Sequence, residues 1–489
     1  MPRSRRHFLV ESAAAAALLH PGLSLLAADS PKKKPVSPFL EGNFAPVREE
    51  FTEENLKVTG TLPKGLEGMF VRNGPNPQFD PVGNHHWFDG DGMVHGVRLR
   101  DGKASYRNRF VRTAGYTEEK KAGKPLYGGI LDTPDMKKLF AGENPFKNPA
   151  NTALVYHHDK LLALWEVGEP YELKLPSLET VGPATFGGKL KQPFTAHPKV
   201  DPVTGEMLYF GYVPNQPLVL FGTLNKKGEW QKPLPVKLEK PAMIHDFVVT
   251  KNYALFPAWP ETFDLKRLAK GESPWFFDKQ QPTRWVVVPR AGDGKPKTFE
   301  AKTAFAFHLL NAWESGDEIT VVGCRYPRFP GALTFGEKDD DKTPNAAVPY
   351  QWTLNLKTDK LTETPLHDFA AEFPRHNDTL VGQAVRYGYV GVGEGDFFDG
   401  LRKLDLKTGK FSDHTYGKGR FGGEGVFVPN PDGKGEDAGW LLTFVYDNAA
   451  DKSELVVMDA ADMTAKPVAR VHLPTRVPYG FHGAWVSGV

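Results

Sequence analysis

Four histidines stand in contexts where together they could bind a metal ion. Of the 15 histidines, these four occupy turn-rich or strand-edge surroundings: His197 in Ala-His-Pro-Lys, His245 in His-Asp-Phe, His308 in Phe-His-Leu-Leu and His482 in Phe-His-Gly-Ala-Trp. Imidazole nitrogen suits Fe, Zn, Cu and Ni. Four neutral imidazoles would leave a divalent metal with its full charge. An Fe(II) ion, which prefers six positions, would keep two open for dioxygen and for substrate or water.

Three glutamates lie in apolar strand surroundings, where an unpaired carboxylate is unfavourable. They are Glu166 in Leu-Trp-Glu-Val, Glu372 in Glu-Phe-Pro-Arg and Glu424 in Gly-Glu-Gly-Val-Phe. Carboxylates behind histidine ligands would balance the metal charge and orient each ring through an N–H to carboxylate hydrogen bond. A structural zinc site would instead show closely spaced ligands, which this sequence does not supply.

The spacing of these residues predicts the architecture that would bring them together. Positions 197, 245, 308, 372, 424 and 482 are separated by 48, 63, 64, 52 and 58 residues. Four-stranded propeller blades have periods of roughly 40–50 residues or more, and a propeller brings the inner strand of every blade to a common axis. Residues one blade apart therefore converge there.

The rest of the body reads as short strands. Glycine (49) and proline (42) are frequent and bound short apolar runs, as expected for strands joined by turns. Predicted strands are Met207–Tyr212, Trp285–Val288, Glu318–Tyr326, Gly388–Val392, Gly439–Tyr446 and Glu454–Met458. Short helices are predicted at Thr133–Phe140 and Phe263–Lys270. The heptapeptide at 354–360 recurs in similar form at 404–410, which favours a propeller over a sandwich.

Composition excludes several other classes of protein. The 61 basic and 59 acidic residues give a net charge of +2 with no basic stripe, so nucleic acid is not an expected partner. The single cysteine, Cys324, excludes a disulfide framework and a thiolate metal cluster. The sequence has no apolar run of about 18 residues, the length that indicates a transmembrane helix.

The N-terminus resembles a twin-arginine export signal. Arg5 and Arg6 precede an apolar, alanine-rich stretch with small residues near Ala28. We therefore expect a signal peptide at 1–28, a flexible linker at 29–44, a single domain at 45–489 and export to the periplasm. An Arg/Ala-rich helix and an organellar transit peptide are the alternatives.

The body resembles the carotenoid cleavage oxygenases, a non-haem iron family, over roughly residues 45–485. The resemblance is carried by Gly68–Pro77, His86–His95, Tyr106–Thr113, Asn151–Tyr156, Thr195–Met207, Asn311–Glu314 and Arg476–His482. It implies an all-β, seven-bladed propeller with a cap of short helices and loops over the metal face. It further implies one Fe(II) per chain on His197, His245, His308 and His482, supported by Glu166, Glu372 and Glu424.

The same resemblance implies cleavage of a conjugated double bond of a carotenoid or apocarotenoid by O₂, with 9,10 (9′,10′) cleavage favoured. Large apolar residues beside the candidate ligands are expected to line a tunnel for the lipophilic polyene: Trp165, Met243, Phe307 and Tyr326. Trp165 occupies the position where a lysine is expected in stilbene-cleaving members, which favours a polyene.

Three alternatives remain open at this level. They are cleavage of a stilbene, an isomerase reaction at the same iron site, and a non-catalytic periplasmic propeller that binds ligands. The last predicts loss of at least one ligand or supporting carboxylate, and none is lost. Shallow membrane contact is also open, with Met136, Leu139, Phe140 and Phe146 as candidate anchors.

Overall fold

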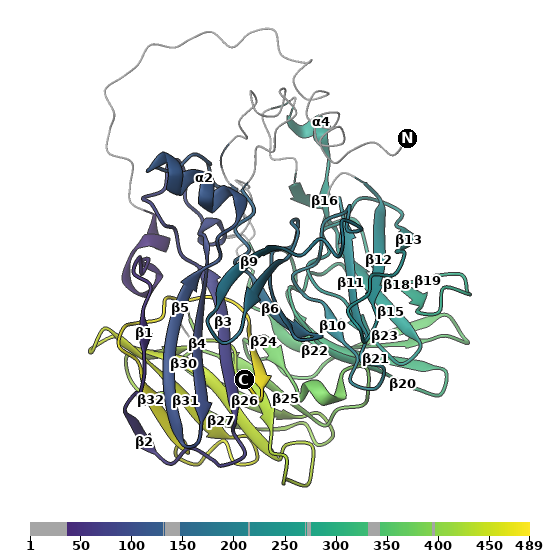
Figure 1. Cartoon of the computed structure of the whole chain (residues 1–489). Helices are drawn as coiled ribbons and strands as arrows, with labels where there is room; N and C mark the ends of the chain where they lie inside the picture. The colour runs from purple at the N-terminus through teal and green to yellow at the C-terminus, as the bar shows by residue number, and fades with distance from the viewer. Residues whose placement is uncertain are drawn as a thin grey trace.

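Seven antiparallel sheets are arranged as blades around a common axis (Figure 1), which confirms the predicted seven-bladed propeller. The computed structural model describes residues 37–489 except 131, 133–146, 214–215, 269, 271–274, 331–342 and 394–396. The predicted signal peptide, the first half of the predicted linker (29–36), the helix expected at 133–140 and the four candidate membrane anchors lie outside the described residues.

The blades follow one another along the chain, and neighbouring strands within each blade are hydrogen-bonded. In blade 1 the strands pair in the order β1 (Thr52–Glu53), β5 (Lys103–Phe110), β4 (Gly92–Arg100), β3 (Gly68–Pro75) and β33 (Gly483–Ser487). In blade 2 the order is β6 (Ala153–His157), β7 (Lys160–Leu164), β8 (Tyr171–Lys174) and β9 (Glu179–Pro183). In blade 3 it is β10 (Lys199–Val200), β11 (Met207–Tyr212), β12 (Leu218–Leu224) and β13 (Leu234–Lys237).

The remaining blades repeat this pattern. Blade 4 contains β14 (Val248–Val249), β15 (Tyr253–Ala258), β18 (Thr283–Pro289) and β19 (Lys297–Ala301). Blade 5 contains β20 (Leu309–Ser315), β21 (Glu318–Arg325), β22 (Val348–Asn355) and β23 (Lys360–Pro365). Blade 6 contains β24 (Glu372–Arg375), β25 (Tyr387–Val392), β26 (Gly400–Asp405) and β27 (Lys410–Thr415). Blade 7 contains β2 (Val58–Gly60), β32 (Ala469–His472), β31 (Lys452–Asp459) and β30 (Gly439–Asp447), with β28 (Arg420–Gly422) and β29 (Val426–Pro429) both on β30.

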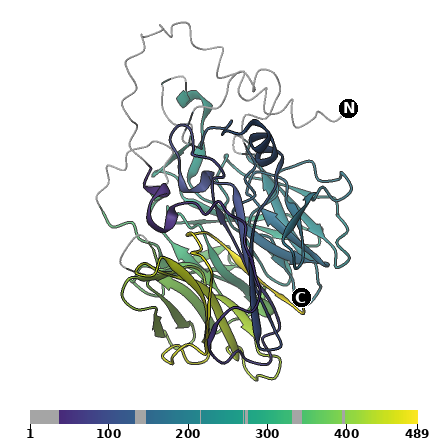
Figure 2. The ribbon, with the colours of Figure 1, turned by 60° about the vertical axis from the view of Figure 1, so that its left-hand side comes forward.

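The ring closes where the two ends of the described chain meet. Strand β33 pairs with β3 in blade 1, and β2 pairs with β32 in blade 7. In Figures 1 and 2 the yellow C-terminal strand accordingly lies beside the purple and blue N-terminal strands. Because each junction joins strands from opposite ends, neither blade 1 nor blade 7 is complete until both ends are in place.

The predicted strands are confirmed, and the two copies of the repeated heptapeptide occupy equivalent positions in neighbouring blades. Both copies of the heptapeptide form the turn between the third and fourth strands of a blade, β22–β23 in blade 5 and β26–β27 in blade 6. Neighbouring blades bury their faces against each other. Trp285 of blade 4 and Trp352 of blade 5 are both fully buried, with ring centroids 5.3 Å apart.

Short segments form a cap over one face of the propeller, at the top of Figure 1. They include α2 (Ala114–Ala122), α4 (Leu265–Leu268), the 3₁₀ turns η1 (Pro38–Leu40), η2 (Gly42–Phe44) and η3 (Trp87–Asp89), and the hairpin β16 (Glu261–Phe263) to β17 (Trp275–Phe277). A further 3₁₀ turn, η5 (Asp378–Leu380), follows β24. The helix expected at 263–270 is shorter than predicted, because Phe263 pairs with Trp275 in the hairpin. None of the described helices is long and apolar enough to cross a membrane.

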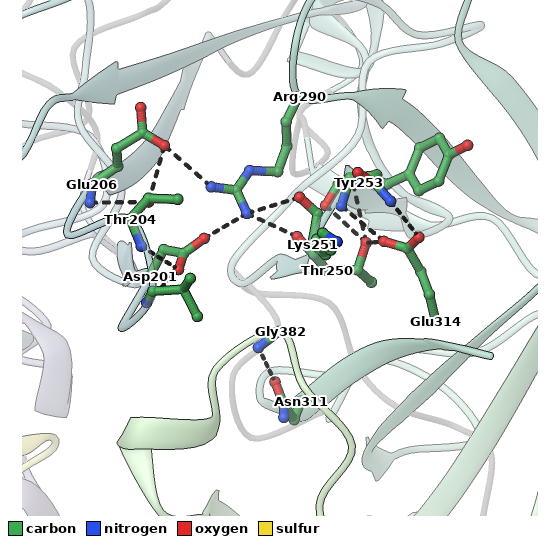
Figure 3. Close-up of polar contacts among 12 residues, drawn as sticks. Asp201, Thr204, Glu206, Thr250, Lys251, Tyr253, Arg290, Asn311, Glu314 and Gly382 are labelled. Carbon is green, nitrogen blue, oxygen red and sulfur yellow. Dashed lines mark hydrogen bonds and ion pairs between the residues drawn. The ribbon is translucent and has the colours of Figure 1, made fainter. Parts of the chain in front are cut away.

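Partly buried polar contacts join blades 3, 4 and 5 (Figure 3). Arg290 directly follows β18, and its guanidinium contacts Asp201 Oδ2 at 2.7 Å and Glu206 Oε2 at 3.3 Å on blade 3. It also donates to the carbonyl of Thr250 at 2.8 Å. Glu314 of blade 5 accepts from the Thr250 hydroxyl at 2.5 Å. The segment around Thr250 is therefore held from both sides.

Replacing Arg290 should destabilise the ring. Arg290→Met would leave Asp201, whose side chain is only 10% exposed, without its cation. Loss of one partner of a buried pair should lower the free energy of unfolding by about 3 kcal/mol. Urea denaturation measures this free energy. The control variant is Lys297→Met, which breaks the exposed Lys297–Asp359 pair and should change the free energy of unfolding by less than about 0.5 kcal/mol. Equal effects of the two variants would contradict this role of Arg290.

Candidate metal centre

The candidate ligands stand where inner strands begin. His308 and His482 directly precede β20 and β33, and His197 and His245 come two and three residues before β10 and β14. The inner strands of successive blades are neighbours, as β33 lies beside β6 and β29, and β14 beside β20. Because these inner strands run in the same direction, their first residues lie together at one end of the propeller axis.

The structure brings the four histidines together. One donor atom of each lies within 4.8 Å of those of the other three. The Nε2 atoms of His197 and His245 are 3.0 Å apart. Ring centroids of His197 and His482 are separated by 4.6 Å, and those of His308 and His482 by 4.8 Å. Among the described residues, these four form the one cluster of histidine, cysteine or carboxylate side chains with metal-site geometry.

Each of the three glutamates binds the outer nitrogen of one histidine. His245 Nδ1 is 2.5 Å from Glu166 Oε2, and His308 Nδ1 is 2.6 Å from Glu372 Oε2. His482 Nδ1 is 2.9 Å from Glu424 Oε1. A carboxylate accepts the Nδ1 proton, so the lone pair of each ring is on Nε2, where a metal would bind. His197 has no carboxylate partner of this kind among the described residues.

The carboxylates are themselves held by residues that the sequence patterns did not single out. The Tyr212 hydroxyl donates to Glu166 Oε1. The backbone N–H of Phe373 donates to Glu372 Oε2 at 2.6 Å, and that of Gly483 donates to Glu424 Oε2 at 2.9 Å. The guanidinium of Arg375 lies 3.4 Å from the same Glu424 oxygen. Tyr212 ends a predicted strand and Arg375 closes the Glu-Phe-Pro-Arg motif, but neither position reveals its partner.

Burial keeps two of the rings neutral while one carboxylate stays charged. Burial lowers the pKa of His197 well below its ordinary value, and His245 and His482 lower it further. Burial also lowers the pKa of His482 to about 4, although Glu424 opposes this. Burial alone would raise the pKa of Glu424, but Arg375 and His482 outweigh it and lower the pKa to about 2. Neutral imidazole beside ionised carboxylate is the state that metal binding requires.

His308 differs from the other two rings. Burial disfavours its protonation, but the charge and hydrogen bond of Glu372, aided by Asp246 and Glu424, raise its pKa. The carboxylates behind the rings, those of Glu166, Glu372 and Glu424, thus place negative charge around a cluster of nitrogen donors. That donor set fits a divalent transition metal held by His197, His245, His308 and His482.

Two of the four expected tunnel residues lie close to the cluster. The Phe307 ring is 5.3 Å from that of His245 and 6.0 Å from that of Tyr326. The partly buried Tyr326 phenol lies beside Glu372, and both its burial and that carboxylate raise its pKa well above the ordinary value. Met243 packs at the edge of the core between blades 4 and 5, and its N–H donates to the carbonyl of Glu261 in the cap hairpin.

Trp165 lies farther toward the cap, in the wall of a cavity that it shares with Phe88, Tyr127 and Ile130. Phe373 was not predicted from the sequence as a residue of the site. Its ring centroid is 4.9 Å from that of His308 and 5.0 Å from that of His482. Phe373 therefore covers two candidate ligands at once. In the sequence, only its position directly after Glu372 indicated that Phe373 would lie near the metal centre.

The sequence is similar to those of known carotenoid-cleaving enzymes over nearly its whole length. The family model described as retinal pigment epithelial membrane protein matches residues 44–487. The chain is 40% identical to carotenoid 9,10(9′,10′)-cleavage dioxygenase 1 of Pisum sativum, over 92% of this chain and 90% of that protein. It is 35% identical to a carotenoid cleavage oxygenase of Mycobacterium tuberculosis, over 92% and 97%.

Solved structures show the same architecture. Lignostilbene dioxygenase of Pseudomonas brassicacearum superposes with a TM-score of 0.85 at 31% identity, covering 93% of this chain and 99% of that one. A mutant of the Synechocystis apocarotenoid oxygenase superposes with a TM-score of 0.82 at 31% identity, covering 90% and 97%. A cobalt-substituted form of the Synechocystis enzyme has a TM-score of 0.80 at 30% identity, covering 90% and 97%.

Removal of one imidazole should abolish metal binding. His308→Ala deletes a nitrogen donor and leaves Glu372 without its ring, so Fe(II) affinity should fall more than about 100-fold, beyond the loss typical of an outer partner. Metal content after dialysis, measured by elemental analysis, checks this. His158→Asn, at an exposed turn, is the matched control and should keep full metal. Full iron in purified His308→Ala would exclude His308 as a ligand.

Proposed function

This chain belongs to the carotenoid cleavage oxygenase family, the family of retinal pigment epithelial membrane protein, and from that membership we propose that it is a dioxygenase acting on a conjugated double bond of a carotenoid or apocarotenoid. The observation that carries the proposal is the cluster of His197, His245, His308 and His482 with a carboxylate behind three of the rings. The oxidoreductase class of the relatives agrees with this.

We propose Fe(II) as the metal, one per chain. When bound, ferrous iron supplies the one-electron chemistry with O₂ that no amino-acid side chain provides. The part of this chain is to hold three imidazoles in one orientation through their Nδ1 hydrogen bonds, and to place the polyene beside them. Because those Nδ1 atoms are engaged by carboxylates, the rings serve as ligands rather than as proton carriers.

Binding of the polyene rests on apolar surface. Phe307 and Phe373 lie against the histidines, and Trp165 and Phe88 line the cavity toward the cap. A long polyene that buries several hundred Å² would gain on the order of 10 kcal/mol before the cost of association. We propose that these contacts determine which double bond of the substrate is positioned beside the metal.

The similarity to the Pisum sativum dioxygenase, whose name specifies the 9,10(9′,10′) bond, supports cleavage at that position. Stilbene cleavage is the second candidate, because lignostilbene dioxygenase shares the architecture. Trp165 argues against it, since the resemblance predicts a lysine there in stilbene-cleaving members. A polyene therefore fits this site better than a phenol.

Product analysis tests the substrate class. Protein reconstituted with Fe(II) under anaerobic conditions is mixed in air with β-carotene, an apocarotenal or resveratrol. We expect the 9,10 bond of the polyenes to yield a ketone at the methyl-bearing carbon and an aldehyde at the other. With ¹⁸O₂, both products should carry label, as read by chromatography with mass spectrometry.

The controls separate the possible failures. His308→Ala should give no product. Cleavage of resveratrol without cleavage of either polyene would contradict the substrate class. Iron-loaded protein that cleaves none of the three compounds would contradict the enzymatic function and favour a ligand-binding propeller.

We further propose shallow contact with a lipid surface, which co-sedimentation with lipid vesicles would test.

We also propose export to the periplasm through the paired arginines Arg5 and Arg6. The double variant Arg5→Lys/Arg6→Lys keeps the charge but removes the pair, so unexported protein should accumulate inside the cell. Arg3→Lys is the matched control and should be exported normally. Cell fractionation with immunoblotting measures both, and undiminished export of the double variant would contradict this route.

A further inference from the structure

Strand β24 is irregular at the metal centre. Glu372 pairs with Gly391 and Arg375 with Tyr389, so two residues of β24 stand opposite one residue of β25. Within this bulge, Phe373 has a φ of 52°, a left-handed conformation that is unfavourable for an aromatic residue. Such strain persists only where the surroundings enforce it. In this strand the Phe373 N–H is fixed by Glu372 Oε2 at 2.6 Å.

The bulge changes which side chains reach the axis. In a regular strand, residues three apart point to opposite faces. An extra residue re-aims the side chains that follow it. Glu372 contacts His308, and Arg375 contacts Glu424, the partner of His482. One four-residue strand thus serves two candidate ligands from adjacent parts of the ring.

Arg375 makes three contacts that hold the neighbourhood of His482. Its Nη1 lies 3.4 Å from Glu424 Oε2 and donates to the Gly483 carbonyl at 3.3 Å. Its Nη2 contacts Asp378 Oδ2 at 2.8 Å on the outer side. Glu424 is almost fully buried, with a side chain 3% exposed. A planar guanidinium suits this forked arrangement better than an ammonium would.

Charge gives Arg375 a second role. The Arg375 guanidinium lies between two carboxylates and places positive charge beside Glu424 on the side of the metal centre, while Asp378 contacts its other nitrogen. Within the described part of the chain, Glu424 is the one of the three carboxylates with a guanidinium beside it, whereas Glu166 has the Tyr212 phenol. The Glu424–His482 pair is therefore held by a positive charge in addition to the backbone N–H of Gly483.

We propose that Arg375 is a positioning residue that fixes His482 through Glu424, and that bulged strand β24 couples the placement of His482 to that of His308. This inference rests on the proposed metal role of the four histidines. Phe373, with its ring against both histidines, keeps the two from moving independently.

The test measures Co²⁺ binding to the purified protein, with Co²⁺ as the spectroscopic substitute for Fe(II). Arg375→Met should weaken Co²⁺ affinity ten- to a hundredfold, in the range known for outer-shell partners, and should shift the visible absorption bands of the bound ion. Arg402→Met is the matched control, because Arg402 lies on β26 of the same blade and pairs with Asp413. Its affinity and spectrum should match those of the wild type.

A double-mutant cycle distinguishes positioning from general destabilisation. If Arg375 acts through Glu424, adding Arg375→Met to Glu424→Gln should weaken Co²⁺ binding by less than about threefold. Added to Glu166→Gln, the same change should retain its full effect. Should Arg375→Met fail to fold, Arg375→Lys replaces it in the same cycle, with a smaller loss of affinity but the same pattern.

Two results would overturn the inference. One is wild-type Co²⁺ affinity and an unchanged spectrum in the Arg375 variant. The other is a loss that multiplies equally with Glu424→Gln and with Glu166→Gln. Wild-type protein that binds no Co²⁺ would instead contradict the proposed metal centre, so the two failures are distinguishable.

Discussion

The hydrogen bond from a histidine Nδ1 to a largely buried carboxylate is the interaction on which the rest of the centre depends. It occurs three times, at His245, His308 and His482, and each time it turns Nε2 toward the common axis. Carboxylates with so little exposure to water are tolerable only beside hydrogen-bond donors and positive charge. The blades, the Tyr212 phenol and the Arg375 guanidinium supply the donors, and a bound cation would complete the balance.

Much of this arrangement was predictable, because the ligands occupy equivalent places in a repeating fold. His308 and His482 each stand directly before an inner strand, so their separation along the chain follows the length of the blades. The strands themselves were predictable from apolar runs such as Met207–Tyr212, which matches β11. Local pattern was less reliable in the cap, where Phe263 joined a hairpin rather than a helix.

The residues that hold the three glutamates were not predictable, since their roles depend on contacts between segments far apart in the sequence. Tyr212 reaches Glu166 from another blade, and Arg375 reaches Glu424 across a blade boundary. Phe373 takes a left-handed backbone conformation that aromatic residues disfavour, so the conformational preference of its residue type would not have predicted it. Long-range contacts of this kind leave no periodicity in a single sequence, whereas the blade repeat does.

Ring closure has a consequence for how the protein is made. Strand β33, which follows His482, joins blade 1 only after the strands of all the other blades have been synthesised. A growing chain on the ribosome therefore possesses His197, His245 and His308 long before the fourth imidazole emerges. Stable capture of the metal belongs after translation of the ring, and a nascent chain stalled before β33 would hold an incomplete centre.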